Sequence, residues 1–176
     1  MRHLNVRQAL SGVFFWAALW CVTTAASAGP SAVSLETLEG TPATLEQFTG
    51  QGQWLVVKIW ASTCHVCNET AHEMVALSRQ RKDNLQVLGI AVDGHHNRPG
   101  VLAFIERHAL NYPTLLDDGR GAADIYRRGV GRDWGGWTPT FLIYSPTGQL
   151  VAQNVGAVAA SDVMRFVDSY QAEAQH

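Results

Sequence analysis

Two cysteines that lie three residues apart, Cys64 and Cys67, carry the most reactive chemistry in this chain of 176 residues. They follow an apolar run at 54–59 and open a segment in which apolar residues recur at helical spacing. At a helix N-terminus, unpaired N–H groups and the helix dipole favour an anion, so the first cysteine can become a thiolate at modest cost. A thiolate is the species that attacks disulfides, and the pattern therefore predicts thiol–disulfide exchange.

The first 28 residues have the order of a secretory signal. Arg2 and Arg7 precede an apolar block at 13–22, and small residues ending in Ala26-x-Ala28 follow it. We expect cleavage after Ala28 and export to the periplasm or an equivalent extracytoplasmic space. The apolar block is short for a membrane span, and an uncleaved membrane anchor is the alternative.

The exported part, residues 29–176, has the length of one domain. Loss of the signal removes two arginines and no acid, which leaves the domain acidic overall and without a basic stripe for nucleic acid. Cys64 and Cys67 are its only cysteines, and a chain of this size builds a core without a disulfide framework. The pair is therefore more consistent with a reactive role than with a structural disulfide.

Apolar periodicity and turn residues predict one continuous α/β pattern. Strands are expected at 35–38, 54–60, 85–92, 113–117, 140–144 and 149–155, and helices at 64–81, 99–109, 122–128 and 162–172. This alternation favours a central mixed sheet with helices on both faces. In the first long helix the expected buried stripe is Val66, Thr70, Met74 and Leu77, and Ser161 is the expected cap of the last helix.

The motif Trp60-Ala61-Ser62-x-Cys64-x-x-Cys67 after a buried strand, with Thr138-Pro139-Thr140 late in the chain, resembles the thioredoxin superfamily. The segment 38–45 and a helix-bearing insert at about 99–117 resemble its envelope branch, which includes the TlpA, ResA and CcmG/DsbE proteins. The resemblance covers about residues 35–170. It implies a thioredoxin-like α/β fold with an N-terminal extension and a central insert, and an exported or membrane-tethered thiol–disulfide oxidoreductase.

The resemblance also implies roles for the two cysteines and for the proline. Cys64 would be the exposed nucleophile that attacks a partner's disulfide, and Cys67 the buried thiol that resolves the mixed disulfide. The helix dipole independently favours Cys64 as the attacker, since it is nearer the helix start. Pro139 corresponds to the family's cis-proline, which faces the pair and leaves the backbone of Thr138 free to pair with an incoming chain. A trans proline at a strand start is the alternative.

Tryptophans are expected in two different settings. Trp134 and Trp137 directly precede the Thr-Pro pair, so in the family's geometry they would border the active site and form a rim that binds a protein substrate. Trp54 and Trp60 lie in an apolar strand and are expected in the core.

Several residues around the cysteines depart from the family's usual residues or carry charge. Thr63 stands in place of an aromatic, Thr70 in place of a glutamate, and Lys58 in place of a buried aspartate that accepts the proton of the resolving thiol. A cation at Lys58 would favour thiolate and make the disulfide easier to reduce. A carboxylate partner or a solvent-directed amine would instead make it structural.

His65 follows the nucleophile directly, and its imidazolium could stabilise the thiolate further. A solvated side chain with little effect is the alternative. Together with Lys58 and with Trp60 of the motif, His65 is expected to tune the site.

We predict an enzyme without a cofactor or a metal, which exchanges disulfides with protein partners. The branch resemblance implies a reductase of exported proteins, such as apocytochrome c or copper-site assembly partners, recycled by a membrane redox partner and monomeric. Lys58 and His65 favour the opposite direction, that of an oxidase or isomerase. The non-enzyme alternatives are a Cys/His copper-binding chaperone without redox turnover and a pure interaction domain that uses residues 134–137.

Overall fold

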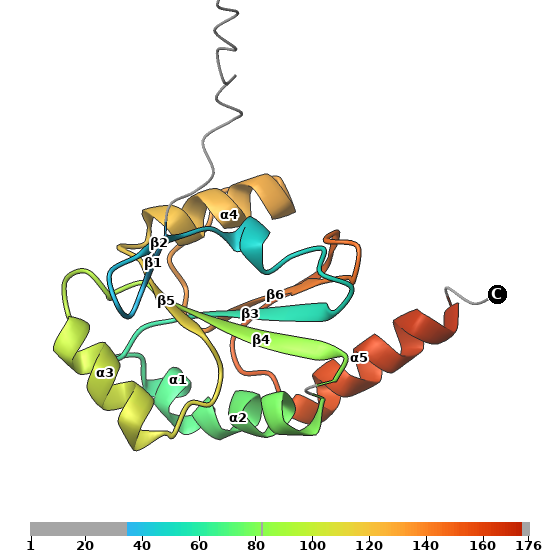
Figure 1. Cartoon of the computed structure of the whole chain (residues 1–176), viewed down its shortest axis with the longest axis horizontal. Coiled ribbons are helices and arrows are strands. Elements are labelled where there is room, and N and C mark those ends of the chain that lie inside the picture. The colour runs from blue at the N-terminus through green and yellow to red at the C-terminus, as the bar shows by residue number, and fades with distance from the viewer. Residues whose placement is uncertain (1–34, 82, 174–176) are drawn as a thin grey trace, which may run out of the picture.

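The structure is a computed structural model, and it describes residues 35–81 and 83–173. The predicted signal peptide at 1–28 lies outside the described residues. One mixed sheet of seven strands runs through the described chain in the order β2-β1-β5-β4-β3-β6-β7 (Figure 1). The strands are β1 (Leu35–Thr37), β2 (Pro42–Ala43), β3 (Trp54–Trp60), β4 (Leu85–Ala91), β5 (Thr114–Leu116), β6 (Thr140–Tyr144) and β7 (Leu150–Val155).

Helices cover both faces of this sheet. They are the 3-10 turn η1 (Leu45–Gln47) and the helices α1 (His65–Glu69), α2 (Ala71–Gln80), α3 (Arg98–Arg107), α4 (Arg120–Val130) and α5 (Ala160–Glu173). Figure 1 shows α4 on one side of the sheet, with α1, α2 and α5 on the other. The predicted α/β fold with a central mixed sheet is confirmed.

Strand β3 is the centre of the fold, because it pairs in parallel with β4 and antiparallel with β6. All seven of its residues are buried, which explains the unbroken apolar run in the sequence. Side chains alternate across the sheet. Leu55, Val57 and Ile59 pack in the core beneath α4, whereas Trp54 and Trp60 pack in the cores beneath the helices of the other face.

The parallel pairing of β3 and β4 determines where the active-site loop lies. Parallel strands end at the same edge of a sheet, so the residues after Trp60 and those after Ala91 emerge side by side. The backbone N–H of Val92 donates to the carbonyl oxygen of Trp60 at 2.9 Å. The loop that carries Cys64 therefore has the loop after β4 as its neighbour.

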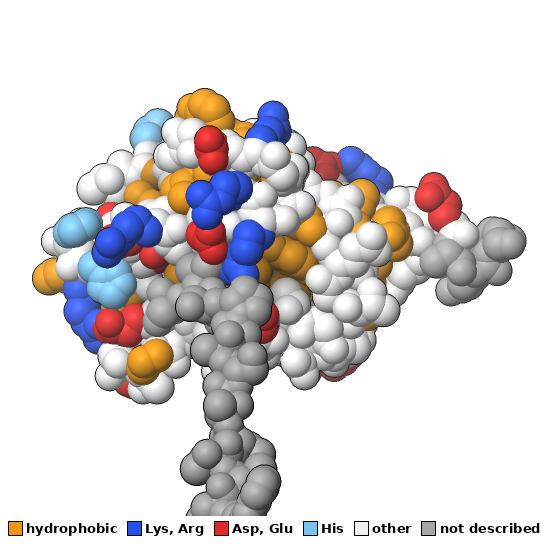
Figure 2. Space-filling model, turned by 90° about the horizontal axis from the view of Figure 1, so that it is seen from above, with side chains coloured by type: hydrophobic (Ala, Val, Ile, Leu, Met, Phe, Trp, Pro, Cys, Tyr) orange, Lys and Arg blue, Asp and Glu red, His pale blue; other side chains and the backbone are white. Residues whose placement is uncertain are grey.

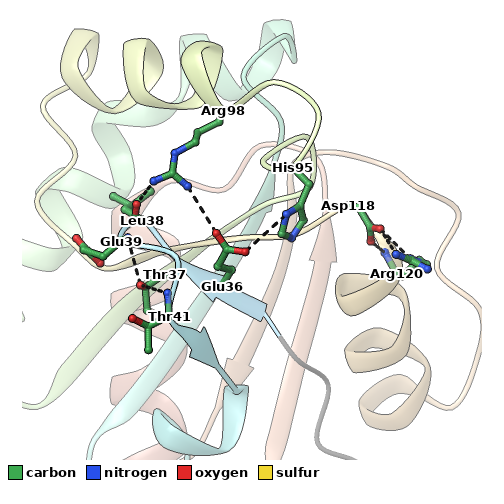
Figure 3. A network of polar contacts seen from close by, with 9 residues as sticks. All are labelled: Glu36, Thr37, Leu38, Glu39, Thr41, His95, Arg98, Asp118 and Arg120. Atoms are coloured by element: carbon green, nitrogen blue, oxygen red, sulfur yellow. Dashed lines mark hydrogen bonds and ion pairs between the residues drawn. The ribbon is translucent and has the colours of Figure 1, made fainter.

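The N-terminal hairpin of β1 and β2 extends the sheet beyond β5 and is tied to the start of α3. Figure 3 shows the guanidinium of Arg98 between the carboxylate of Glu36, at 3.6 Å, and the carbonyl oxygen of Leu38. His95 lies on the other side of the same carboxylate, at 3.9 Å. The predicted strand at 35–38 is confirmed within one residue, whereas the short strand β2 was not predicted.

The predicted single helix at 64–81 is wrong in one respect, because it is divided into α1 and α2. Thr70 ends the first helix and begins the second, with φ −107° and ψ 13°, and its hydroxyl donates to the carbonyl oxygen of Val66 at 2.7 Å. A hydroxyl that bonds back to the preceding turn competes with regular helical bonding. Val66 is 36% exposed instead of buried, so the stripe that packs on the sheet begins at Cys67 and continues through Met74 and Leu77.

The predicted cap of the last helix is also wrong. Helix α5 begins at Ala160, so Ser161 lies inside its first turn and is exposed. The backbone N–H of Ala160 donates instead to the carboxylate of Glu73, on α2, at 2.8 Å. A cap supplied by another helix has no local sequence signal.

Among the described residues, we find no helix with the length and apolar character that a membrane crossing requires.

Candidate active site

Cys64 and Cys67 form a disulfide at the start of α1. Cys64 is the N-cap residue of this helix, with φ −71° and ψ 117°, and its Sγ accepts a hydrogen bond from the backbone N–H of Cys67 at 3.1 Å. Cys67 is completely buried, whereas Cys64 is half-buried. The arrangement matches the expectation of an accessible first sulfur at the positive end of a helix and a protected second one.

The second half of the motif reaches the disulfide from the far end of the chain. The Thr138–Pro139 peptide bond is cis, as the resemblance implies. Cys64 Sγ lies 3.3 Å from the carbonyl oxygen of Thr138, 74 residues away in the sequence. Once the disulfide is reduced, a thiol at this place has an acceptor within hydrogen-bond distance. The structure therefore brings Cys64, Cys67, Thr138 and Pro139 together.

Lys58 is buried in a way that neither structural alternative describes. Its side chain is 1% exposed, so the amine does not reach solvent, and no carboxylate among the described residues forms an ion pair with it. The Nζ atom lies 6.0 Å from the ring centroid of Phe141 and has no hydrogen-bond partner in the described part of the chain. Burial lowers the pKa of Lys58 to about 8, because desolvation penalises the charged form.

The alternation along β3 places Lys58 on the face of the sheet that also carries Trp60. Trp60 is completely buried in the core that contains Cys67, and its ring stacks on Phe104 of α3 with centroids 4.2 Å apart. Lys58 thus shares a face of the sheet with the core that contains the resolving cysteine.

His65 points along the surface of α1. Its side chain is 85% exposed, and Nε2 lies 3.1 Å from the carboxylate of Glu69, one turn further along. A carboxylate at that distance offsets the charge that the imidazolium would offer to Cys64. Thr63, directly before Cys64, is exposed.

The two rim tryptophans lie in different environments. Trp137 is 59% exposed, next to Thr138, and its ring lies against the backbone of Gly135. Trp134 is half-buried against the core beneath α4, and its Nε1–H donates to the hydroxyl of Thr140 at 3.2 Å. That hydroxyl donates in turn to the carbonyl oxygen of Trp137 at 2.6 Å. Trp134 therefore supports the loop, and Trp137 is the tryptophan on its surface.

A hydrogen-bond network from the loop after β4 holds the residues before Cys64. The backbone N–H of Ser62 donates to both oxygens of Asp93, at 3.2 and 3.1 Å, and its hydroxyl donates to Oδ2 at 2.5 Å. The amide of Asn97 donates to the same hydroxyl oxygen at 3.0 Å. Sequence reasoning assigned Asp93 and Asn97 only to a polar loop, and no local signal marks them, because their contacts with Ser62 depend on β3 and β4 being parallel neighbours.

A second network joins the start of α1 to the end of α3. The side-chain N–H groups of Asn68 donate to the carbonyl oxygens of Ser62, at 3.1 Å, and Cys64, at 2.9 Å. His108 Nε2 lies 3.0 Å from Asn68 Oδ1. Since an amide oxygen can only accept, Nε2 is the donor in this contact. Burial, with Arg107 and Lys58 nearby, lowers the pKa of His108. Sequence reasoning had missed Asn68 as well.

Charges on the face shown in Figure 2 lie next to charges of opposite sign, and histidines gather at one edge. On α4, for example, Arg128 pairs with Asp124 at 3.0 Å. Within the part of the chain that the structure describes, no group of three or more His, Cys, Asp or Glu side chains is arranged to hold a metal ion.

Comparisons with known proteins show which proteins this chain resembles. A protein-family model described as the AhpC/TSA family matches residues 25–153. The thiol-disulfide oxidoreductase ResA of Halalkalibacterium halodurans is 27% identical over 165 residues, which cover 93% of this chain and 88% of that protein.

Solved structures show the same fold. A secreted Mycobacterium tuberculosis disulfide oxidoreductase, homologous to E. coli DsbE, has a TM-score of 0.60 and 23% identity, over 77% of this chain and 94% of that one. A putative thiol:disulfide interchange protein DsbE of Chlorobium tepidum has a TM-score of 0.59 and 20% identity, over 74% and 85% of the two chains. These similarities confirm the predicted thioredoxin-like fold.

Proposed function

The chain belongs to the AhpC/TSA family, and from this premise we propose that it is an extracytoplasmic reductase of disulfides in exported proteins. Its membership, its similarity to ResA and its Cys64–Cys67 disulfide make it a thiol–disulfide oxidoreductase of the ResA/DsbE type. Beyond this, we propose its compartment, the direction of electron flow, its partners and the roles of its site residues. The observation that carries it is the placement of Cys64 Sγ between the N-terminus of α1 and Thr138.

In the proposed reaction the dithiol form attacks. The Cys64 thiolate attacks one sulfur of a partner's disulfide, which forms a mixed disulfide and releases one partner thiolate. Cys67 then loses its proton and attacks Cys64 Sγ, so that the Cys64–Cys67 disulfide forms and the second partner thiolate leaves. Both partner thiolates take up protons, and the partner has gained two electrons.

Each turnover consumes the dithiol, so a reductant must restore it. We propose a membrane redox protein for this step, because an exported domain is separated from cytoplasmic reductants. The compartment itself rests on the order of basic, apolar and small residues in the first 28 positions, with a retained anchor as the alternative. The protein is proposed to act as a monomer.

One of the two arguments for an oxidant is weaker than the sequence suggested. His65 and Lys58 would make the disulfide easier to reduce if they carried positive charge near the sulfurs. The carboxylate of Glu69 lies 3.1 Å from the His65 ring and offsets the charge of an imidazolium, whereas Lys58, with a pKa lowered to about 8, keeps most of its charge at pH 7. The reductase direction is therefore proposed from the similarity to the ResA and DsbE proteins.

Lys58 and Trp60 are proposed to tune Cys67 from the sheet side. A buried amine on the same face of β3 favours a thiolate above it when it is protonated. The buried, stacked ring of Trp60 excludes water from the resolving sulfur and keeps its surroundings apolar. His65 is proposed to have the smaller effect, because its side chain is exposed.

The partner surface is proposed to consist of the exposed apolar residues around the disulfide. Trp137 is 59% exposed beside Thr138, and Val66 is 36% exposed between the two cysteines. Val155 is 44% exposed and pairs with Thr140, directly after Pro139. An extended segment that brings a sulfur to Cys64 would pass over these side chains, and the backbone of Thr138 is proposed to pair with it. Trp134 would support this surface from the core.

Trapping of partners in the cell tests the function. A Cys67→Ser variant attacks but does not resolve, so we expect it to accumulate reductant-sensitive adducts with exported proteins that carry close cysteine pairs, of the apocytochrome c or copper-site type. A Cys64→Ser variant is the control and should form none. Absence of adducts in the Cys67→Ser strain would contradict the proposed partners.

A copper-loaded sample tests the chaperone alternative. Stoichiometric copper on Cys64 and Cys67 in a protein without measurable disulfide exchange would support a carrier and contradict the proposed function. Retention of full biological activity by Cys64→Ser would instead support a pure interaction domain.

A further inference from the structure

The turn that presents Cys64 is held by a carboxylate in the loop after β4. Residues 61–64 form a tight turn in which the N–H of Cys64 donates to the carbonyl oxygen of Ala61 at 3.1 Å. Ser62 lies inside this turn, and both its backbone N–H and its hydroxyl donate to the carboxylate of Asp93. Hydrogen bonds to an ionised acceptor are about twice as strong as neutral ones. The turn is therefore bound at its centre by the loop after β4.

Asp93 is itself fixed in place. Its carbonyl oxygen accepts hydrogen bonds from the N–H groups of His96, at 3.2 Å, and Asn97, at 2.7 Å. The next residue, Gly94, packs so closely on β5 that a Cβ there would lie 2.9 Å from the Cα of Leu116. The carboxylate is thus presented from a rigid loop.

Asn97 determines how the Ser62 hydroxyl is used. Its amide N–H donates to Ser62 Oγ, which leaves the single hydroxyl proton free to be donated to Asp93 Oδ2. The Ser62 hydroxyl therefore both accepts a hydrogen bond from the loop after β4 and donates one to it. Rotation of the turn would break these hydrogen bonds together.

We propose that Asp93 is a positioning residue for the redox pair and acts through Ser62. In the disulfide form the S–S bond itself restrains Cys64. In the dithiol form that bond is absent, and the Asp93–Ser62 contact keeps the Cys64 sulfur at the N-terminus of α1, within reach of the N–H of Cys67. The inference deepens the proposed function, because it assigns to this contact the readiness of Cys64 to attack.

The pH profile of Cys64 alkylation in the reduced protein tests this role. We expect Asp93→Ala and Ser62→Val to slow the reaction with iodoacetamide at pH 7 about fivefold and to move the profile to higher pH, because a displaced thiolate loses its N–H donor. Ser62→Thr keeps the hydroxyl on a side chain shaped like that of valine, and should rescue the rate. Asp83→Ala, at the opposite end of β4, is the matched control and should react as the wild type does.

A double variant tests whether Asp93 acts through Ser62. If it does, Asp93→Ala/Ser62→Val is no slower than the slower single variant, whereas multiplied effects would overturn the proposal. So would wild-type rates in both single variants, equal slowing by Ser62→Thr and Ser62→Val, or a profile moved to lower pH in Asp93→Ala, which would indicate an effect of its charge alone.

Melting of the disulfide form confirms that each variant is folded before reduction. Alkylation needs no partner protein. A wild-type protein that is alkylated at Cys64 but exchanges no disulfide would contradict the proposed function, whereas the effect of Asp93 on alkylation could still be measured.

Discussion

Cys64 Sγ lies 3.3 Å from the carbonyl oxygen of Thr138, although 74 positions separate the two residues in the sequence. The contact exists because β3 and β6 are antiparallel neighbours, so that the end of one and the start of the other meet at the same edge of the sheet. A partner sulfur that bonds to Cys64 must therefore approach beside the backbone of Thr138. This single contact joins the reacting atom to the surface proposed for partner binding.

The two cysteines are expected to differ strongly in reactivity. Cys64 is half-buried at a helix N-terminus, whereas Cys67 is completely buried. In the reduced protein we expect iodoacetamide to modify Cys64 roughly a hundredfold faster than Cys67, because the thiolate that is both stabilised and accessible reacts first. Peptide mapping by mass spectrometry at partial modification measures the ratio, and equal labelling would contradict the assignment of attacker and resolver.

The buried amine of Lys58 is expected to make stability depend on pH. Burial lowers its pKa from 10.5 to about 8, so between these values the unfolded chain binds a proton that the folded chain has released. The loss of stability from burying the charged amine is complete below about pH 8, where both the folded and the unfolded chain hold the proton. It is relieved as the pH rises towards 10.5. We therefore expect Lys58→Met to raise the free energy of unfolding at pH 7 by on the order of 3 kcal/mol.

Denaturant unfolding of the wild type and Lys58→Met at several pH values checks this expectation. The difference between the two proteins should shrink across pH 8 to 10.5, and titrations of all other groups cancel in that difference. A difference that stays constant over this range would mean that the amine ionises as it does in the unfolded chain.

Trp137 is expected to matter for protein substrates and not for small ones. Its ring is 59% exposed beside Thr138, and large aromatic side chains at the centre of an interface often contribute most of the binding energy. Trp137→Ala should lower kcat/KM for a protein disulfide about tenfold, while the rate with a small disulfide such as that of glutathione stays unchanged. Leu102→Ala, at an exposed apolar residue of α3, is the matched control.

Equal loss with both substrates would instead show that Trp137→Ala damages the redox pair itself. Trp134 differs from Trp137, because it packs against the core beneath α4 and is therefore expected to contribute to the stability of the fold.

Local patterns predicted most of the sheet and the reactive pair. The apolar run at 54–60 gave β3, and the resemblance supplied the cis bond before Pro139. The division of the helix at Thr70 could not be predicted, because a threonine within a helical pattern does not have to interrupt the helix. The cap of α5 by Glu73 and the Asp93–Ser62 contact were also out of reach, since both depend on which elements become neighbours in the folded sheet.

The environment of Lys58 is the clearest case of a sequence ambiguity that only packing resolves. From the sequence the amine could reach solvent, pair with a carboxylate or remain buried. Strand order decides among these, because β4 and β6 flank β3 on both sides and leave Lys58 1% exposed.

The reduction potential of the Cys64–Cys67 pair tests the central claim, that the protein is a reductase, most directly. The fraction of disulfide at equilibrium with defined glutathione buffers at pH 7, read after acid quenching and thiol labelling, gives this value. We predict a potential more negative than about −200 mV, on the side of glutaredoxins and thioredoxin. A less negative potential, towards the roughly −120 mV of DsbA, would contradict the account and assign the protein to disulfide formation.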